Sequence, residues 1–272
     1  MRKLLVILTF FSLFIGACGS EDQQVIRIKG DDVGFFIFED FFQSYNNQVP
    51  DVTFEFQGGG SQTGLNAMLD DTVQMVFTLK ELNNEDLILL RNKNIYATKI
   101  ELVKIPQIII VNYQLPFNDL TFPQVKGIFT GFNQFRFWWS LAKTNRQDFM
   151  QLGAVELCTL DLRNGEASFF KEALGITDFP LDIKYFNHNY ALIDYIAKNK
   201  SAIGTISMPF FTRADEVKII YAGENLEATG YLLLDKKLEQ NAHIQSMLYN
   251  LKKNLFQNKL FLRQKGIKII EE

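Results

Sequence analysis

Residues 52–69 read VTFEFQGGGSQTGLNAML, and this stretch decides the fold class of the chain. Alternation of apolar and polar residues over Val52–Phe56 predicts a β-strand, and Gln62–Leu69 reads as the start of a helix. Gly58-Gly59-Gly60 between them lets the backbone turn sharply and approach a ligand closely. Ser61 can cap the helix, whose first amides point outward at the positive end of the helix dipole. The stretch therefore predicts a strand–turn–helix unit that is able to cradle an anion.

The glycine loop by itself leaves two interpretations open. It lacks the Lys-Ser/Thr ending of an ATP-type phosphate loop, and Gly64 stands in the wrong register for a dinucleotide-binding GxGxxG motif. A purely structural turn with a capped helix explains the same residues as well as an anion site does.

Outward from this unit, strands and helices alternate along the chain. This alternation implies parallel pairing and an α/β layer fold. The expected strands are 25–29, 74–78, 105–111, 157–162, 203–207, 217–220 and 267–270, and the expected helices are 35–45, 85–91, 120–131, 167–174, 190–198 and 242–261.

Composition excludes several classes of protein. The 272 residues are 47% hydrophobic and 22% charged, which is an ordinary globular balance and not that of a disordered or collagen-like chain. A net charge of −3 gives no basic excess, so no nucleic-acid partner is expected. Two cysteines and two histidines cannot build a disulfide scaffold and leave little for a zinc site, so we expect no metal and no cofactor.

The N-terminus is typical of an export signal. Arg2 and Lys3 precede an apolar run from Leu4 to Ile15, broken only by one threonine and one serine. Twelve helical residues rise about 18 Å, too little to cross a hydrocarbon core of about 30 Å. Residues 1–17 are therefore predicted to be a signal peptide.

Ile15-Gly16-Ala17-Cys18 is similar to the bacterial lipobox, although leucine is more usual than isoleucine at its first position. The resemblance implies that Cys18 is lipidated and becomes the mature N-terminus, followed by a polar tether over 18–24. A plain signal peptide with an incidental cysteine is the alternative. We accordingly expect an exported protein at the periplasmic or cell-surface face, anchored by lipid to a bacterial membrane.

Five segments, taken in order, resemble the phosphate-binding receptor family of bacterial ABC importers. They are IRIKGD (26–31), PDV with GGGSQTGL (50–52 and 58–65), LTFPQVKGIFTG (120–131), LRNG (162–165) and AIGTIS (202–207). The QVKGIFTG portion is the strongest single match.

The resemblance implies a two-lobed periplasmic-binding-protein (type II) fold with mostly parallel sheets flanked by helices. Lobe 1 would comprise residues 25–111 and 209–272, and lobe 2 residues 112–208. A small anionic solute, phosphate or similar, would bind in the cleft between the lobes. The protein would then be a receptor, with an ABC permease as a possible partner, and not an enzyme.

The resemblance also designates the residues expected to bind the ligand. Ser61 and Arg163 match ligand-contacting positions of the family. Departures stand at Asp31, where a serine is usual, at Lys80, and at Glu166. The full set of expected ligand-binding residues is Asp31, Ser61, Gln62, Lys80, Arg163, Glu166 and Ser168.

The two carboxylates favour an alternative function. A like charge 4 Å from a bound anion costs about 4 kcal/mol at an effective dielectric constant near 20, or about a thousandfold in affinity. The alternative is a receptor-like interaction or sensor module that has lost phosphate binding and fills its cleft with Arg163–Glu166 or Lys80–Asp pairs. An enzyme ranks last, because the sequence shows no nucleophile or metal constellation.

Two further features have structural interpretations. The aromatic run Phe135–Trp139 is expected to pack inside lobe 2, with a partner-docking or membrane-facing patch as the less favoured reading. Cys158 is expected to be a buried strand cysteine and not a nucleophile.

Overall fold

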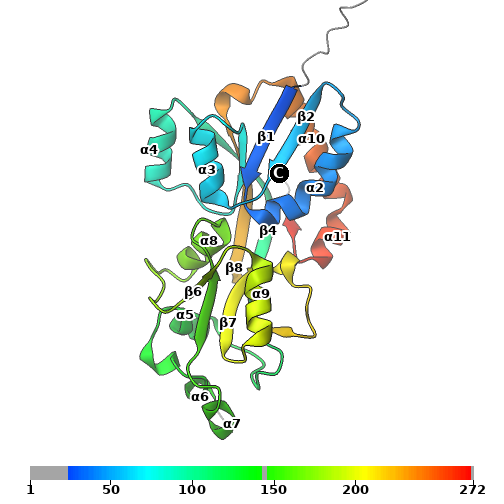
Figure 1. Cartoon of the computed structure of the whole chain (residues 1–272). Coiled ribbons are helices and arrows are strands. Elements are labelled where there is room, and N and C mark those ends of the chain that lie inside the picture. Colours follow the sequence, from blue (N-terminus) through cyan, green and yellow to red (C-terminus); the bar gives the residue numbers. More distant parts are fainter. Residues whose placement is uncertain (1–23, 143–145, 271–272) are drawn as a thin grey trace, which may run out of the picture.

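The computed structural model describes residues 24–142 and 146–270, which form two lobes stacked end to end (Figure 1). The predicted signal peptide and Cys18 lie outside the described residues. Strands and helices follow one another as β1 (Gln24–Gly30), α2 (Asp32–Asn46), β2 (Val52–Gln57), α3 (Ser61–Leu69), β3 (Met75–Thr78), α4 (Asn84–Asn92), β4 (Ala97–Asn112), α5 (Phe122–Phe129), α6 (Trp138–Leu141), α7 (Arg146–Met150), β5 (Glu156–Leu160), α8 (Gly165–Ala173), β6 (Lys184–Phe186), α9 (Asn189–Lys198), β7 (Ala202–Ser207), β8 (Val217–Asp235), α10 (Ala242–Gln257), α11 (Lys259–Gln264) and β9 (Lys268–Ile269).

All of these strands belong to one continuous sheet with the order β2-β1-β3-β8-β4-β7-β5-β6, and β9 pairs with β4. Parallel pairs lie toward the two ends, where β1 pairs with β2 and β3, and β5 pairs with β6 and β7. The pairs in the middle, formed by β4 and β8 with each other and with their neighbours, are antiparallel. The α/β class predicted from the sequence is confirmed.

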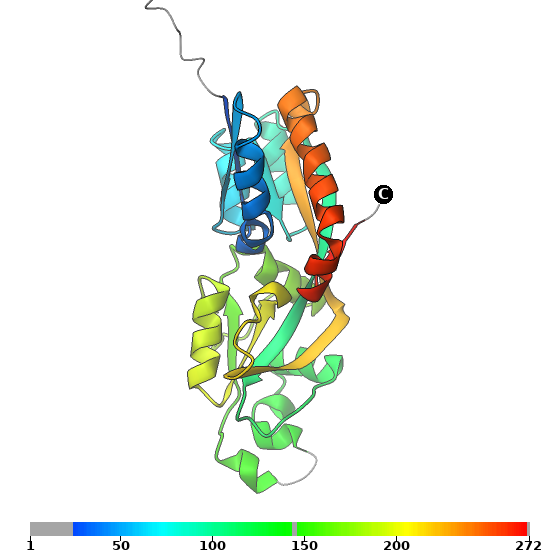
Figure 2. The ribbon, with the colours of Figure 1, turned by 90° about the vertical axis from the view of Figure 1, so that its right-hand side faces the viewer.

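The long strands β4 and β8 connect the lobes. They pair from Ala97↔Asp235 in the upper lobe to Asn112↔Val217 in the lower lobe, with register shifts on the way. Figure 2 shows both strands running from one lobe into the other. Because each strand belongs to both lobes, no single residue divides them, and the expected lobe boundaries stay a proposal.

Helices cover the sheet with the faces that their sequences predict. In α2 the buried apolar side chains include Phe38, Phe41, Phe42 and Tyr45, spaced three and four residues apart. Their rings pack against β2, where Phe42 stacks on Phe54 at a centroid distance of 6.2 Å. Much of the high phenylalanine content is thus used to fill this core.

The sequence underestimated both crossing strands and missed several short elements. The expected strands 105–111 and 217–220 are only parts of β4 and β8, since the neighbouring residues 97–104 and 221–235 include charged and glycine positions that weaken the strand pattern. The short elements β6, α6 and α7 were not predicted, and the expected tail helix is interrupted at Asn258.

The expectation for Cys158 is confirmed, whereas the expected packing of the aromatic run inside lobe 2 holds only in part. In the aromatic run, Trp138 is fully buried and donates its indole N–H to the Ser201 carbonyl at 3.0 Å. Phe137 and Trp139 stack on each other and remain partly exposed. Cys158 is buried in β5, and burial raises the pKa of its thiol to about 12, which keeps it protonated.

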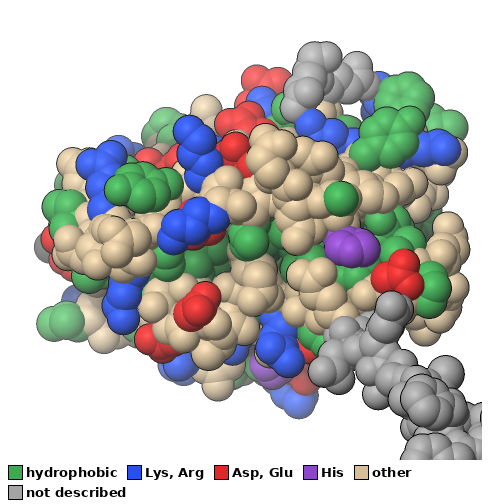
Figure 3. Space-filling model, turned by 90° about the horizontal axis from the view of Figure 1, so that it is seen from above, with side chains coloured by type: hydrophobic (Ala, Val, Ile, Leu, Met, Phe, Trp, Pro, Cys, Tyr) green, Lys and Arg blue, Asp and Glu red, His purple; other side chains and the backbone are tan. Residues whose placement is uncertain are grey.

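Among residues 24–142 and 146–270, no helix is both long and apolar enough to cross a membrane. The surface seen from above interleaves acidic, basic and hydrophobic side chains (Figure 3).

Candidate functional site: an oxyanion cradle between the lobes

The candidate site lies where the two lobes meet. Three segments of the upper lobe reach it: the end of β1 with Asp31, the start of α3 with Ser61, and the end of β3 with Thr78 and Leu79. The lower lobe contributes the start of α8 at Gly165. Two helix N-termini, from α3 and α8, therefore point at one location from opposite lobes, which makes the local potential positive.

The carboxylate of Asp31 occupies this location and accepts four hydrogen bonds. Its Oδ1 accepts from the amides of Ser61 and Gly165, both at 2.7 Å. Its Oδ2 accepts from the Ser61 hydroxyl at 2.5 Å and from the Leu79 amide at 2.8 Å. Three of these bonds come from the upper lobe and one, from the Gly165 amide, comes from the lower lobe. Asp31 is fully buried.

A relay of hydroxyl groups supports this arrangement. The amide of Lys80 donates to Thr78 Oγ1 at 2.9 Å, and Thr78 Oγ1 lies 2.6 Å from Ser61 Oγ. Thr78 Oγ1 also lies within hydrogen-bonding distance of the Lys80 carbonyl, at 3.1 Å. Ser61, Thr78 and the Lys80 backbone thus form a connected hydrogen-bond network beside the carboxyl group.

Two opposing effects act on the pKa of Asp31. Burial is the larger effect and raises the pKa of Asp31 above its ordinary value, and the hydrogen bonds from Ser61, Gly165 and Leu79 offset only part of this increase. Three of the four contacts come from N–H groups, which can only donate, so the carboxyl group is held by donors.

The lobes touch closely at the cradle because two glycines permit it. A Cβ on Gly165 would lie 2.2 Å from Asp31 Oδ2 and 2.3 Å from Ser61 Oγ. A Cβ on Gly60 would lie 2.6 Å from the Arg163 carbonyl oxygen, and Gly60 has a φ of 95°. The amide of Gln62 also donates to the Arg163 carbonyl at 3.0 Å, so backbone atoms join the lobes directly.

Glu166 forms a second buried acidic centre, on the lower-lobe side. Ser207 Oγ lies 2.5 Å from Glu166 Oε1, and Asn189 Nδ2 donates to Oε2 at 2.9 Å. Gln107 Nε2 donates in turn to Ser207 Oγ at 2.6 Å. Burial raises the pKa of Glu166 to about 8, and the charge of nearby Asp31 adds to this increase. Glu166 is therefore protonated, and neutral, at pH 7.

The structure brings together only some of the residues expected to bind a ligand. Asp31 and Ser61 meet in the cradle, and Glu166 is buried near it. The side chain of Gln62 accepts from Lys80 Nζ at 3.2 Å, and Lys80 Nζ is also paired with Asp86 at 2.8 Å, so both lie to one side of the carboxylate.

Arg163 and Ser168 point elsewhere. The Arg163 guanidinium, 61% exposed, pairs with Asp161 at 2.8 Å, so the expected Arg163–Glu166 pair is replaced by an Arg163–Asp161 pair. This happens because Asp161 is two residues away on the same turn and also accepts the Arg163 amide at 2.9 Å. The hydroxyl of Ser168 donates to the Leu162 carbonyl at 3.2 Å.

Sequence reasoning missed several members of the site. The amides of Leu79 and Gly165 were overlooked because a backbone donor leaves no mark on residue type. Thr78 carried a usable signal, since it ends a predicted strand next to the predicted ligand loops. Asn189 and Ser207 lie 23 and 41 residues from Glu166, and only folding places them around it.

The cradle is a set of donors, so it suits an oxyanion and not a cation. Among residues 24–142 and 146–270, no cluster of three or more His, Cys, Asp and Glu side chains is arranged to hold a metal ion. The donors of the cradle are arranged to hold a carboxylate- or phosphate-like group by hydrogen bonds and helix dipoles.

Comparisons with known proteins agree with this architecture. The sequence profile of the PBP superfamily domain matches residues 19–257. A putative phosphate ABC transporter substrate-binding protein with bound phosphate from Clostridium perfringens superimposes with a TM-score of 0.73 at 15% identity, covering 91% of this chain and 100% of that chain. An ABC-type phosphate transport receptor from Vibrio cholerae gives 0.68 at 19% identity, covering 90% and 100%.

A regulatory domain shares the fold as well. The regulatory domain of NMB2055 (MetR), a LysR family regulator from N. meningitidis, gives a TM-score of 0.55 at 11% identity and covers 91% of this chain and 100% of that chain. No curated protein sequence matches the chain.

Proposed function

This chain belongs to the PBP superfamily, and from that premise we propose that it is an exported, lipid-anchored, receptor-like interaction module that carries its own ligand. The carboxylate of Asp31 takes the place of a solute anion between the lobes. The single observation that supports this function is the set of four hydrogen bonds, from both lobes, that Asp31 accepts.

The proposal follows from what a binding protein of this fold does with its ligand. An anion that bridges donors on both lobes favours the closed shape, because the open shape loses half of those contacts. Here a side chain of the protein itself supplies the bridge. We infer that the closed shape exists without any solute and is the form that a partner meets.

Inorganic phosphate would have to displace Asp31 to bind in the cradle. Asp31 is part of the same chain, so it competes at the high effective concentration of an intramolecular group. A displaced but nearby carboxylate would still cost about 4 kcal/mol at 4 Å, or about a thousandfold in affinity. We therefore expect no phosphate binding by the wild-type protein at millimolar concentration.

Replacing the carboxylate tests the proposal. In Asp31→Ser, the donors of Ser61, Leu79 and Gly165 lose their acceptor, and the serine adds a hydroxyl where the resembling family usually carries one. The variant is expected to gain phosphate binding, measured by isothermal titration calorimetry in a phosphate-free buffer. A second change, Ser61→Ala, should weaken that gained binding.

Asp40→Ser is the matched control, because it removes one carboxylate from the exposed side of α2 and leaves the cradle intact. It should behave as the wild type does. If the wild-type protein binds phosphate and Asp31→Ser binds it no better, the proposal fails and the chain is a solute receptor in which Asp31 yields to the anion.

A further inference from the structure

The outward surface of the last two helices carries unusually large apolar side chains. Helix α10 buries Ile244, Met247, Leu251 and Leu255 toward the core. On its other side it exposes Tyr249 (69%) and Phe256 (63%), seven residues apart and so on one face. Leu260 (78%) and Phe261 (58%) continue the exposure onto α11. We call Tyr249, Phe256, Leu260 and Phe261 the C-terminal patch.

Positive charge accompanies this patch. Residues 240–270 contain no Asp or Glu but six basic residues, and Glu271 and Glu272 follow. Residues 240–272 thus sum to +4, whereas residues 1–239, with 22 basic against 29 acidic side chains, sum to −7. The C-terminal segment is therefore basic, although the rest of the chain is acidic in sum.

The basic and aromatic side chains are interleaved in space. Lys259 Nζ lies 5.9 Å from the centre of the Phe256 ring, and Lys265 Nζ lies 5.9 Å from that of Phe261. Lys253 and Arg263 are exposed on the same two helices. Lys268 pairs with Glu227 at 2.6 Å. Aromatic rings among cationic side chains are typical of helices that lie in a membrane interface.

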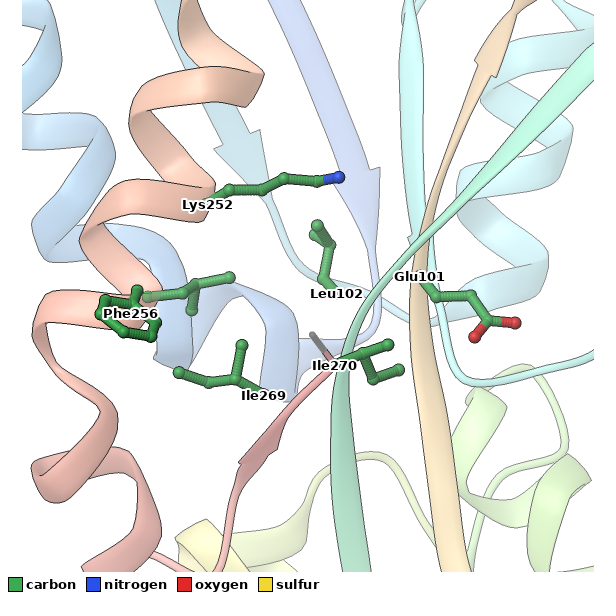
Figure 4. A pocket seen from close by; sticks show the side chains of 7 residues that line it. Glu101, Leu102, Lys252, Phe256, Ile269 and Ile270 are labelled. Atoms are coloured by element: carbon green, nitrogen blue, oxygen red, sulfur yellow. The ribbon is translucent and has the colours of Figure 1, made fainter. Parts of the chain in front are cut away.

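An apolar recess opens beside the patch (Figure 4). It has a volume of about 350 Å³ and is lined mainly by Leu102, Leu255, Phe256, Ile269 and Ile270. Lys252 and Glu101 complete its lining. The surface next to Phe256 therefore offers both an apolar cavity and positive charge.

We propose that α10 and α11 dock on a membrane surface of anionic lipid headgroups through the C-terminal patch. Charge complementarity favours this occupant, because this basic segment coincides with the exposed Phe and Leu side chains of the C-terminal patch. The tether 18–24 could span at most about 25 Å, so a lipid on Cys18 would hold the lobe that contains β1 and α10 near the bilayer. Figure 2 shows β1 and α10 in this same lobe.

The docking surface goes beyond the proposed function and does not depend on Asp31. It can be tested on a chain that starts at Gly19, since every described element begins at Gln24 or later. Flotation with phosphatidylcholine vesicles, with and without added phosphatidylglycerol, measures the partition. The chain is expected to float only with the anionic vesicles and to be released by salt.

Variants locate the contact. Phe256→Ser together with Leu260→Ser should weaken partition by roughly tenfold or more, as expected for removing partly inserted side chains. Ile88→Ser together with Leu89→Ser, which removes exposed apolar side chains from α4, is the matched control. Lys253→Glu should weaken partition more than Lys236→Glu, an equal charge change on the same lobe.

Three results would overturn the docking surface: no preference for anionic vesicles, partition unaffected by the Phe256 and Leu260 changes, or equal effects of the α4 control. If the chain shows no preference for anionic vesicles, an acidic protein becomes the partner that fits this face. Asp31→Ser should leave vesicle partition unchanged, so failure here and failure of the proposed function are separate outcomes.

Discussion

Asp31 and Glu166 are two buried carboxyl groups in neighbouring positions, and burial raises the pKa of both. Asp31 accepts hydrogen bonds on both oxygens, which offset part of the increase in its pKa. Glu166 has fewer partners and a pKa raised by burial to about 8. Two adjacent negative charges in a buried site would repel each other strongly, and this repulsion contributes to the raised pKa of Glu166.

The charge state of Glu166 leads to a prediction for pH. In the folded chain its proton is held up to about pH 8, whereas the unfolded chain releases it near the ordinary pKa of 4.5. Between these values the folded state binds more protons, so the free energy of unfolding falls as pH rises and levels off above pH 8. Glu166→Gln should remove this decline, because a glutamine amide does not titrate. The amide can still donate to Ser207 and accept from Asn189, so the local hydrogen bonds are kept.

Thermal unfolding midpoints across this pH range measure the effect. The thermal midpoint of Glu166→Gln minus that of the wild type should increase as the pH is raised from the acid range toward 8. Asp31 titrates in both chains and cancels from the difference to first order. Glu172→Gln, an exposed change on the same helix, is the control. Parallel curves for the wild type and Glu166→Gln would show that Glu166 is ionised in the folded chain.

At the scale of elements, the site depends on how closely α3 and α8 approach each other across the lobes. Each helix supplies its first amide, from Ser61 and from Gly165, to the same oxygen of Asp31. The approach is possible because Gly165 has no side chain. A helix that begins with any larger residue would hold the lobes apart.

Gly165→Ala should therefore weaken the closed form. Its added methyl group would meet Asp31 Oδ2 and Ser61 Oγ at little more than 2 Å, so one of the lobes has to move. We expect a loss of about 1–3 kcal/mol in the free energy of unfolding, the usual cost of overpacking a buried contact. Urea unfolding measures it, and Glu172→Ala on the same helix, which adds no clash, should change stability much less.

At the scale of the whole molecule, the lobes are joined by the β4–β8 ladder and closed by the cradle. The ladder runs from one lobe into the other, so strands β4 and β8 belong to both lobes. The bond from the Gly165 amide to Asp31 is the polar link that a change at Asp31 removes selectively.

Small-angle X-ray scattering tests closure directly. The wild-type chain should scatter as a closed molecule without solute. Asp31→Ser should show a larger radius of gyration, which decreases when phosphate is added, because the anion restores the bridge between lobes. Equal scattering of both chains without phosphate would mean that Asp31 does not hold the lobes together.

The sequence by itself determined the α/β class, most of the helices and strands, and the glycine loop that starts α3. These depend on local periodicity and turn chemistry, which neighbouring residues such as Gly58–Ser61 fix among themselves. It also singled out Asp31 and Glu166 as carboxyl groups that do not belong in a phosphate site.

Only the tertiary structure decided what those carboxyl groups do. The donors to Asp31 lie 30, 48 and 134 residues further along the chain, and two of these three residues act through their backbone amides alone. A local pattern records which side chains are available, but the partner of a buried charge is set by which distant segments the folded sheet and helices bring within hydrogen-bonding distance.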